Sequence, residues 1–519
     1  MFCLVFKAVA GTLAQRRIRS AALGLCLLLS TISAHAADID VGRLVDQDTI
    51  ETWHRKKDGG RSTFAGTDAW RSHMLFLERQ LAARGVVDIG KRFFSYERWS
   101  VADTAVDVPY EFFVDSESVE VASAWAYSGG TDVDGVTAPL IYYTRKLAPE
   151  SMAEKIVVFD VGSVPDSMRS AFIAGNVYST DTTPPEEIGL AGDQWYQGNV
   201  VTRFGRFDDV LRDSGALGGA VIFDMSPGRA RGLYTFPLLN AGVVGVPGLY
   251  FDRVAGEKIR LAAQRGEQAT LVLHAREGVA DAWFMHGFLP GRAYGTDDDE
   301  LVLLVTHSDG PNLTQENGTL GILGAIDYFS RIPVAERGRS LLVLLDPQHY
   351  MPGRHTIDWY AEHAELTRKI VASVGVEQLG QREYVETGND YALSGHAEQT
   401  LIFVQDNERL IETAIAAVDG FDIPRTDVRV PSRGGQGMWA GLGDIAIKMN
   451  MPGFALSSAM SGYWSTEPGI ESFDAELFSK QLGALVMMTT LLMDADPGEI
   501  AIQSQDPSTN PALSPGVPR

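Results

Sequence analysis

Residues 301–309 read LVLLVTHSD, an apolar run of strand length that ends in a histidine and an aspartate. Two similar runs follow, LLVLL at 341–345 and IVASVGV at 370–376, and helical patterns separate the three. Strands that are apolar throughout and alternate with helices indicate a sheet that is covered on both faces. We therefore predict an α/β domain with a largely parallel sheet.

The sequence on either side supplies further helices and a second, β-rich region. Apolar residues recur at helical spacing over 70–81, 407–418 and 473–492. From 139 to 275 the pattern changes to short strands and Gly-rich turns. The predicted division is a leader at 1–36, an N-terminal part of the α/β domain at 37–136, a β-rich insertion at 137–278, the rest of the α/β domain at 279–494 and a disordered tail at 495–519.

The first 36 residues are typical of a cleavable signal peptide. Basic residues precede an apolar run at 21–29, and Ala34 and Ala36 are the small residues that signal peptidase requires. A membrane anchor is the alternative, but this run is about half of the roughly 20 residues that a bilayer demands. We expect cleavage near Ala36 and a periplasmic or extracellular protein. Both cysteines would leave with the leader, so any metal ligands would be His, Asp or Glu.

The charge of the chain restricts its partners. The formal net charge is −23, which repels nucleic acid and anionic lipid. Beyond the leader, no segment is long and apolar enough to span a membrane. The sequence therefore predicts neither nucleic-acid binding nor membrane insertion.

Polar side chains gather where the three predicted strands end. Ligands of α/β sheets bind at the carboxyl ends of the strands, so these side chains are candidates for one site. An imidazole with nearby carboxylates is typical of a metal half-site. Each piece alone also fits an ordinary turn or helix cap. The metal-competent residues are His307, Asp309, Glu316, Asp346, His349 and Glu377.

These motifs resemble the M28 family of zinc aminopeptidases and their carboxypeptidase relatives. His307-Ser308-Asp309 matches the family's His-x-Asp, and Glu316-Asn317-Gly318 stands where it has Asp-Asn-Gly. Residues 139–275, with GALGGAVIFD at 215–224, are similar to the protease-associated (PA) domain inserted in many members. The resemblance implies a three-layer domain with a mixed sheet, a PA-like domain, a divalent metal ion such as zinc, and hydrolysis of peptide or other amide bonds.

The same comparison shows departures at the active-site positions. Pro347 and Gln348 stand in place of the family's Glu-Glu pair, which supplies the general base and a zinc ligand. Glu316 and Glu377 each replace an aspartate ligand. Trp464 lies in the context of the last histidine ligand. An unaltered two-zinc mechanism is therefore not expected.

Two interpretations follow. In the first, the site has been rebuilt, so that His307, Glu316, His349 and Glu377 hold one or two metal ions. Asp309 then orients His307, and Asp346 or metal-activated water replaces the lost base. In the second, catalysis has been lost, and the domain serves as a binding or assembly module. The sequence leaves both open.

Overall fold

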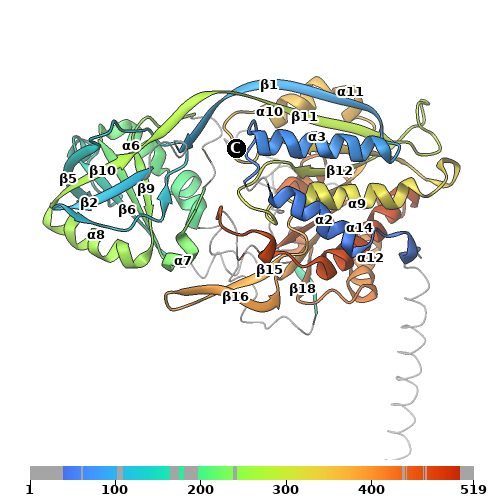
Figure 1. Cartoon of the computed structure of the whole chain (residues 1–519). Helices are drawn as coiled ribbons and strands as arrows, with labels where there is room; N and C mark the ends of the chain where they lie inside the picture. The colour runs from blue at the N-terminus through green and yellow to red at the C-terminus, as the bar shows by residue number, and fades with distance from the viewer. Residues whose placement is uncertain are drawn as a thin grey trace, which may run out of the picture.

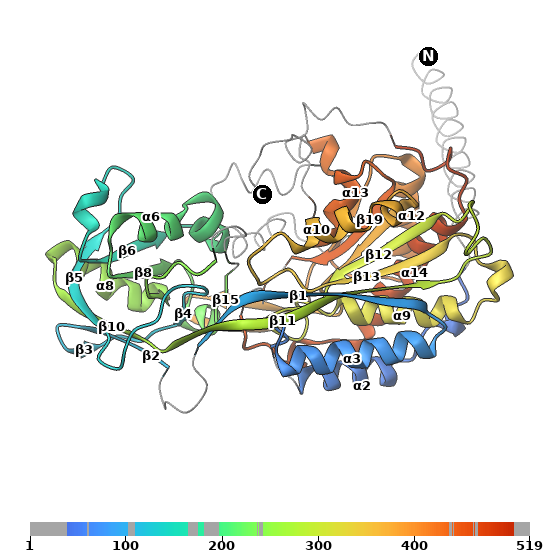
Figure 2. The ribbon, with the colours of Figure 1, turned by 90° about the horizontal axis from the view of Figure 1, so that it is seen from above.

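The structure is a computed structural model, and it describes residues 39–59, 62–101, 109–163, 175–180, 197–235, 237, 242–434, 439, 441–459, 461 and 465–502. Within these residues the chain forms two lobes, each built around a large sheet (Figures 1 and 2). The predicted leader at 1–36 lies outside the described residues. Its cleavage therefore stays a prediction.

The main lobe contains a nine-stranded mixed sheet. Its central strands β13, β12, β14 and β19 run parallel, and antiparallel strands flank them. This arrangement confirms the predicted α/β fold with a mixed, partly parallel sheet. In spatial order the strands are β1 (Val87–Val101), β11 (Ala275–Leu289), β13 (Ser340–Asp346), β12 (Leu301–His307), β14 (Ile370–Val376), β19 (Gly453–Ser458), β17 (Thr400–Val404), β18 (Thr426–Arg429) and β7 (Asn176–Ser179).

Alternate residues of the central strands enter two separate cores, which explains why these strands are apolar throughout. Val302 and Leu304 of β12 belong to one core, and Leu301, Leu303 and Val305 to the other. Helices on the first face are α2 (Gln47–Asp58), α3 (Asp68–Ala83), α9 (Gly318–Ser330), α12 (Glu408–Gly420) and α14 (Ala475–Asp494). Those on the second face are α10 (His355–Glu362), α11 (Ala364–Thr367) and α13 (Ile445–Lys448) (Figure 2).

The second lobe contains the eight-stranded sheet and corresponds to most of the β-rich region of the sequence, although β7 of that region pairs with β18 in the main sheet. The second lobe begins at Tyr110, earlier than the predicted boundary at 137, because β2 pairs with β10. Helices α6 (Phe207–Ser214), α7 (Pro227–Ala230) and α8 (Arg253–Arg265) belong to this lobe. Its strands, in spatial order, are β3 (Glu117–Ser118), β2 (Tyr110–Val114), β10 (Gln268–Leu273), β5 (Val136–Tyr142), β6 (Ile156–Val161), β8 (Gly218–Phe223), β9 (Gly248–Phe251) and β4 (Ser123–Ala124).

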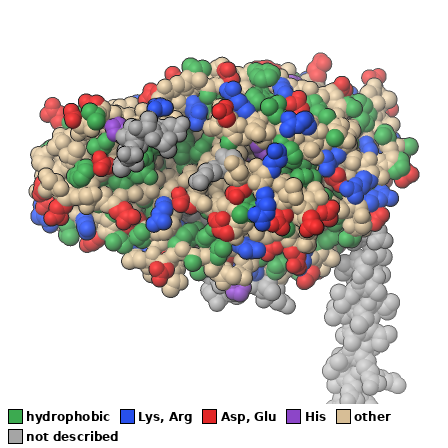
Figure 3. Space-filling model, viewed as in Figure 1, with side chains coloured by type: hydrophobic (Ala, Val, Ile, Leu, Met, Phe, Trp, Pro, Cys, Tyr) green, Lys and Arg blue, Asp and Glu red, His purple; other side chains and the backbone are tan. Residues whose placement is uncertain are grey.

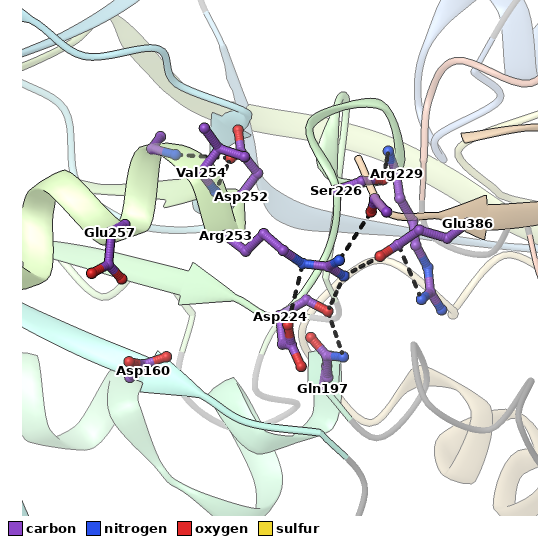
Figure 4. A network of polar contacts seen from close by, with 12 residues as sticks. Asp160, Gln197, Asp224, Ser226, Arg229, Asp252, Arg253, Val254, Glu257 and Glu386 are labelled. Atoms are coloured by element: carbon purple, nitrogen blue, oxygen red, sulfur yellow. Dashed lines mark hydrogen bonds and ion pairs between the residues drawn. The ribbon is translucent and has the colours of Figure 1, made fainter. Parts of the chain in front are cut away.

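Besides smaller contacts, such as the backbone bridge between Leu233 and Ser465, two connections join the lobes. The first is the long antiparallel ribbon of β1 and β11, which runs from one lobe into the other (Figures 1 and 2). The second is a polar contact between the second lobe and a hairpin of the main lobe, formed by β15 (Arg382–Thr387) and β16 (Asp390–Ala397). Glu386 of this hairpin binds Arg253 and Arg229, and Arg253 Nη1 donates to Gly388 O at 3.1 Å (Figure 4).

The end of the chain differs from the predicted tail at 495–519. Ala495 and Ile500 are buried in the main core, and Asn407 Nδ2 donates to Glu499 O and Ala501 O at 3.2 and 2.9 Å. Residues 495–502 therefore pack against the N-terminus of α12, because this segment carries buried apolar side chains among its polar ones. The rest of the predicted tail lies outside the described residues.

The surface of the molecule carries charged side chains of both signs. Acidic and basic side chains are interspersed over the face shown in Figure 3. In the part of the chain that the structure describes, no helix combines the length and the apolarity needed to cross a bilayer.

Candidate functional site

The carboxyl ends of three neighbouring strands form the site. In the parallel pairing of β12 with β13, His307 lies opposite Asp346. Strand β14 is the other parallel neighbour of β12 and is followed at once by Glu377. The segment from β12 to α9 carries Glu316, and the turn after β13 carries His349. The fold thus brings the sequence-predicted residues to one edge of the sheet.

The four predicted metal ligands lie close together as two histidine–carboxylate pairs. His349 Nδ1 is 2.5 Å from Glu316 Oε1, and His307 Nε2 is 3.8 Å from Glu377 Oε1. The two imidazole rings stack between the pairs, with centroids 4.0 Å apart and planes 9° apart. The rings therefore face each other.

Burial dominates the electrostatics of three of the four predicted ligands, Glu316, Glu377 and His307. Glu316 is completely buried and Glu377 nearly so, and desolvation raises the pKa of both carboxyl groups well above the ordinary value. Desolvation, followed by the neighbouring His349, lowers the pKa of His307 far below its usual range. An uncharged His307 and protonated carboxyl groups are favoured unless a cation compensates the buried charge.

Asp309 has a different partner from the one expected. Its carboxylate accepts hydrogen bonds from His349 N at 3.1 Å and Tyr350 N at 2.9 Å. His307 Nδ1 has no hydrogen-bond partner among the described residues, and His307 Nε2 faces Glu377. Asp309 therefore fixes the turn that presents His349, instead of orienting His307.

Asp346 and Gln348 both stabilise the turn after β13. One carboxylate oxygen of Asp346 accepts a hydrogen bond from Gln348 N at 2.7 Å, and the other accepts one from Thr356 Oγ1 at 2.7 Å. The Gln348 side chain folds back, donating to Gly353 O and accepting from Thr356 N. Burial raises the pKa of Asp346 to about 6. Because both of its oxygens are occupied by the turn, this geometry gives no support to Asp346 as general base, and that role stays a prediction.

Sequence reasoning missed a loop that covers Glu377. Leu442 N donates to Glu377 Oε1 at 3.1 Å, and a Cβ on Gly441 would lie 1.8 Å from that oxygen. Gly441 also has a φ of +51°, a left-handed conformation that favours glycine. The close approach of Glu377 and the backbone conformation therefore both require glycine at this position. The Gly-rich run at 434–437 predicts a loop that faces substrate, but residues 435–438 lie outside the described residues, so this stays a prediction. Trp464 also lies outside the described residues.

The side chains fit a divalent metal in their chemistry and only partly in their arrangement. Two imidazoles and two carboxylates are ligands that zinc accepts. Glu316 Oε2 and His307 Nδ1 are buried and have no hydrogen-bond partner among the described residues, as expected of groups that await a cation. Yet within the described part of the chain no group of three or more His, Cys, Asp or Glu side chains is arranged to hold a metal ion.

Solved structures with the same architecture identify the fold. A Peptidase M28 precursor from Shewanella amazonensis superposes with a TM-score of 0.59, covering 89% of this chain and 98% of that one at 12% identity. The aminopeptidase from Aneurinibacillus sp. strain AM-1 gives 0.57, with 90% and 98% covered at 12% identity. The chain has the fold of the M28 peptidases. The zinc aminopeptidase from Bacillus subtilis gives 0.56, with 88% and 98% covered at 12% identity.

The M28-like resemblance predicted from the motifs is therefore confirmed at the level of the fold. No family model matches the sequence, and no curated protein does either. Such low identity fits a divergent chain, and it agrees with the altered residues at the strand ends. The assignment of the second lobe as a PA domain stays a prediction.

Proposed function

We propose that this chain is a hydrolase of peptide or other amide bonds whose site has been rebuilt on an M28-like fold. The observation that carries this proposal is the pair of His–Glu contacts at the carboxyl edge of the sheet. Drift in an unused site would leave isolated polar groups or apolar replacements. Here His349 meets Glu316 and stacks on His307, although the family's Glu-Glu pair is absent.

His307, His349, Glu316 and Glu377 would hold a divalent ion, with zinc as the first candidate because the similar structures include zinc aminopeptidases. Such an ion supplies Lewis acidity for the scissile carbonyl. The chain's own residues provide the remaining functions. Asp309 and the Leu442 amide hold the His349 turn and the Glu377 carboxylate in place.

Incubation of the full-length protein with a mixed peptide library, followed by mass spectrometry, tests this proposal. We expect new cleavage products in the presence of zinc or cobalt, their loss with a chelator, and their absence in the Glu316→Gln variant. An unchanged library under all metal conditions would contradict the proposal.

A second function, peptide or partner binding without catalysis, is favoured by a specific observation. The histidine and glutamate side chains that would bind a metal ion contact one another in pairs. The Gln348 side chain forms hydrogen bonds within its own turn and does not face the site. Retention of library peptides without cleavage, unaffected by chelator, would support this alternative.

Export from the cytoplasm is a further part of the proposal. It is supported by the leader at 1–36, with its basic residues, its apolar run at 21–29 and the small residues Ala34 and Ala36. Mass spectrometry of protein from the native host should find an N-terminus within a few residues of Ala37. Soluble extracytoplasmic protein that retains Met1 would contradict it.

A further inference from the structure

Lys57 on α2 is a buried lysine next to the site. It is 2% exposed, and its Nζ donates to the carbonyl oxygens of Asn312 and Leu313 at 3.0 and 3.2 Å. Both carbonyls belong to the segment that leads from β12 to Glu316. A lysine is rarely buried unless its charge is used, because desolvating an ammonium group is costly.

The N-terminal helices also contact both ends of the segment that carries Glu316. Trp70 Nε1 donates to Ser308 Oγ at 3.2 Å at one end. At the other end His54 Nε2 lies 3.1 Å from Asn317 Nδ2, and His73 Nε2 lies 3.0 Å from Thr319 Oγ1. Among these contacts, Lys57 is the one that brings a positive charge.

Lys57 and Glu316 also act on each other electrostatically. Burial lowers the pKa of Lys57 to about 8, and the charge of Glu316 opposes that shift. For Glu316, burial raises the pKa and Lys57 opposes the rise. For both groups burial has the larger effect on the pKa, and the opposite charge of the other group partly offsets it.

We propose that Lys57 is a positioning residue of the site: its buried ammonium group holds the segment before Glu316 through the carbonyl oxygens of Asn312 and Leu313. This inference rests on the proposed function, since it assigns Lys57 to the same site. It also predicts that the charge of the side chain, and not only its bulk, is required.

Cobalt binding by calorimetry and amide hydrogen exchange of 312–317 test the proposal on full-length Lys57→Met and Lys57→Arg variants. Lys56→Met is the matched control, because Lys56 is the exposed neighbour on the same helix. We expect Lys57→Met to weaken cobalt binding about 10-fold or more, the range for residues that orient metal ligands. It should also accelerate exchange. Lys57→Arg should restore both, and Lys56→Met should change neither.

If Lys57→Met has the same cobalt affinity and the same amide exchange of 312–317 as the parent, the proposal is overturned. If Lys57→Met does not fold, Lys57→Gln replaces it, because the amide keeps N–H donors without the charge of the ammonium group. Parental cobalt affinity and parental exchange in Lys57→Gln would likewise overturn the proposal. If the parent itself binds no cobalt, the proposed function fails. Amide exchange of 312–317 then decides alone whether Lys57 positions this segment. Faster exchange in Lys57→Met, restored in Lys57→Arg, would still support Lys57 as the residue that positions the segment.

Discussion

His349 Nδ1 lies 2.5 Å from Glu316 Oε1, and this contact joins the turn after β13 to the segment before α9. The residue at the family's second glutamate position, Gln348, points instead toward Gly353 and Thr356. A histidine one position later has thus entered the site where a carboxylate ligand is expected. The contact with Glu316 therefore depends on which side chain of this turn faces it, His349 and not Gln348.

The unmodified protein should hydrolyse simple aminoacyl anilides very slowly or not at all. Proline cannot act as a general base, a group that typically contributes roughly 10²- to 10⁴-fold in rate. Restoring the family pair with Pro347→Glu and Gln348→Glu should recover activity only in part, because the second substitution removes the amide that donates to Gly353 O. Adding Trp464→His should recover more. Robust anilide hydrolysis by the parent, abolished by chelator and unaffected by Asp346→Asn, would show that the base lies elsewhere.

Gly441→Ala should displace the Glu377 carboxylate. The added Cβ would meet Oε1 at 1.8 Å, and the residue would be strained at a φ of +51°. We expect a loss of about 2 kcal/mol or more in stability, and weaker cobalt binding. Gly388→Ala is the control, since Gly388 has a φ of +63° with no atom near its Cβ position. Equal losses in the two variants, measured by denaturation, would show that contact with Glu377 does not matter.

Glu386→Gln should loosen the contact between the lobes. Glu386 binds Arg253 and Arg229 with its side chain 13% exposed, so the change removes a charge from a mostly buried network (Figure 4). We expect a loss of about 1.5–3 kcal/mol, as for hydrogen bonds to charged groups, together with faster amide exchange in β15 and β16. As the control, Glu257→Gln removes an exposed partner of Arg260 on α8 of the second lobe and should cost less than about 0.5 kcal/mol. Similar losses for the two changes would argue against a contact that holds the lobes together.

Glu398 should make the stability depend on pH. Burial raises its pKa from 4.5 to about 7, against opposing hydrogen bonds from Ser461. The folded state therefore keeps a proton that the unfolded state releases between about pH 4.5 and 7, and the associated stability is lost as the pH rises through this window. Its size is on the order of 3 kcal/mol. Unfolding measured from pH 4 to 8 should show a flatter profile for Glu398→Gln than for the parent, and parallel profiles would contradict this account.

Much of the main lobe could be predicted from the sequence. The runs at 301–306, 341–345 and 370–376 coincide with β12, β13 and β14, since burial on both faces leaves a continuous apolar signal. Strands β1 and β11 could not be predicted over their full length. Each has 15 residues, of which many are exposed or half-buried, so neither gives an apolar run over its full length.

The site could be predicted only in part. His307, Glu316, His349 and Glu377 could be identified because they follow strand ends, which is a local signal. The partners of Asp309 and the roles of Lys57 and Gly441 depend on contacts between segments far apart in the chain. Lys57 lies 255 residues from Asn312, whose carbonyl group it binds, and no sequence pattern marks such a pairing.

Cobalt binding followed by visible absorption tests the central claim most directly, that the two His–Glu pairs form a divalent-metal site. The parent should bind cobalt with absorption bands that report histidine and carboxylate ligands, and His307→Ala and His349→Ala should each weaken binding about 10-fold or more. His355→Ala should leave binding unchanged, because His355 stacks on Phe94 away from the pairs. Absence of cobalt bands in the parent, or equal binding in the His349 variant and the parent, would contradict the rebuilt metal site.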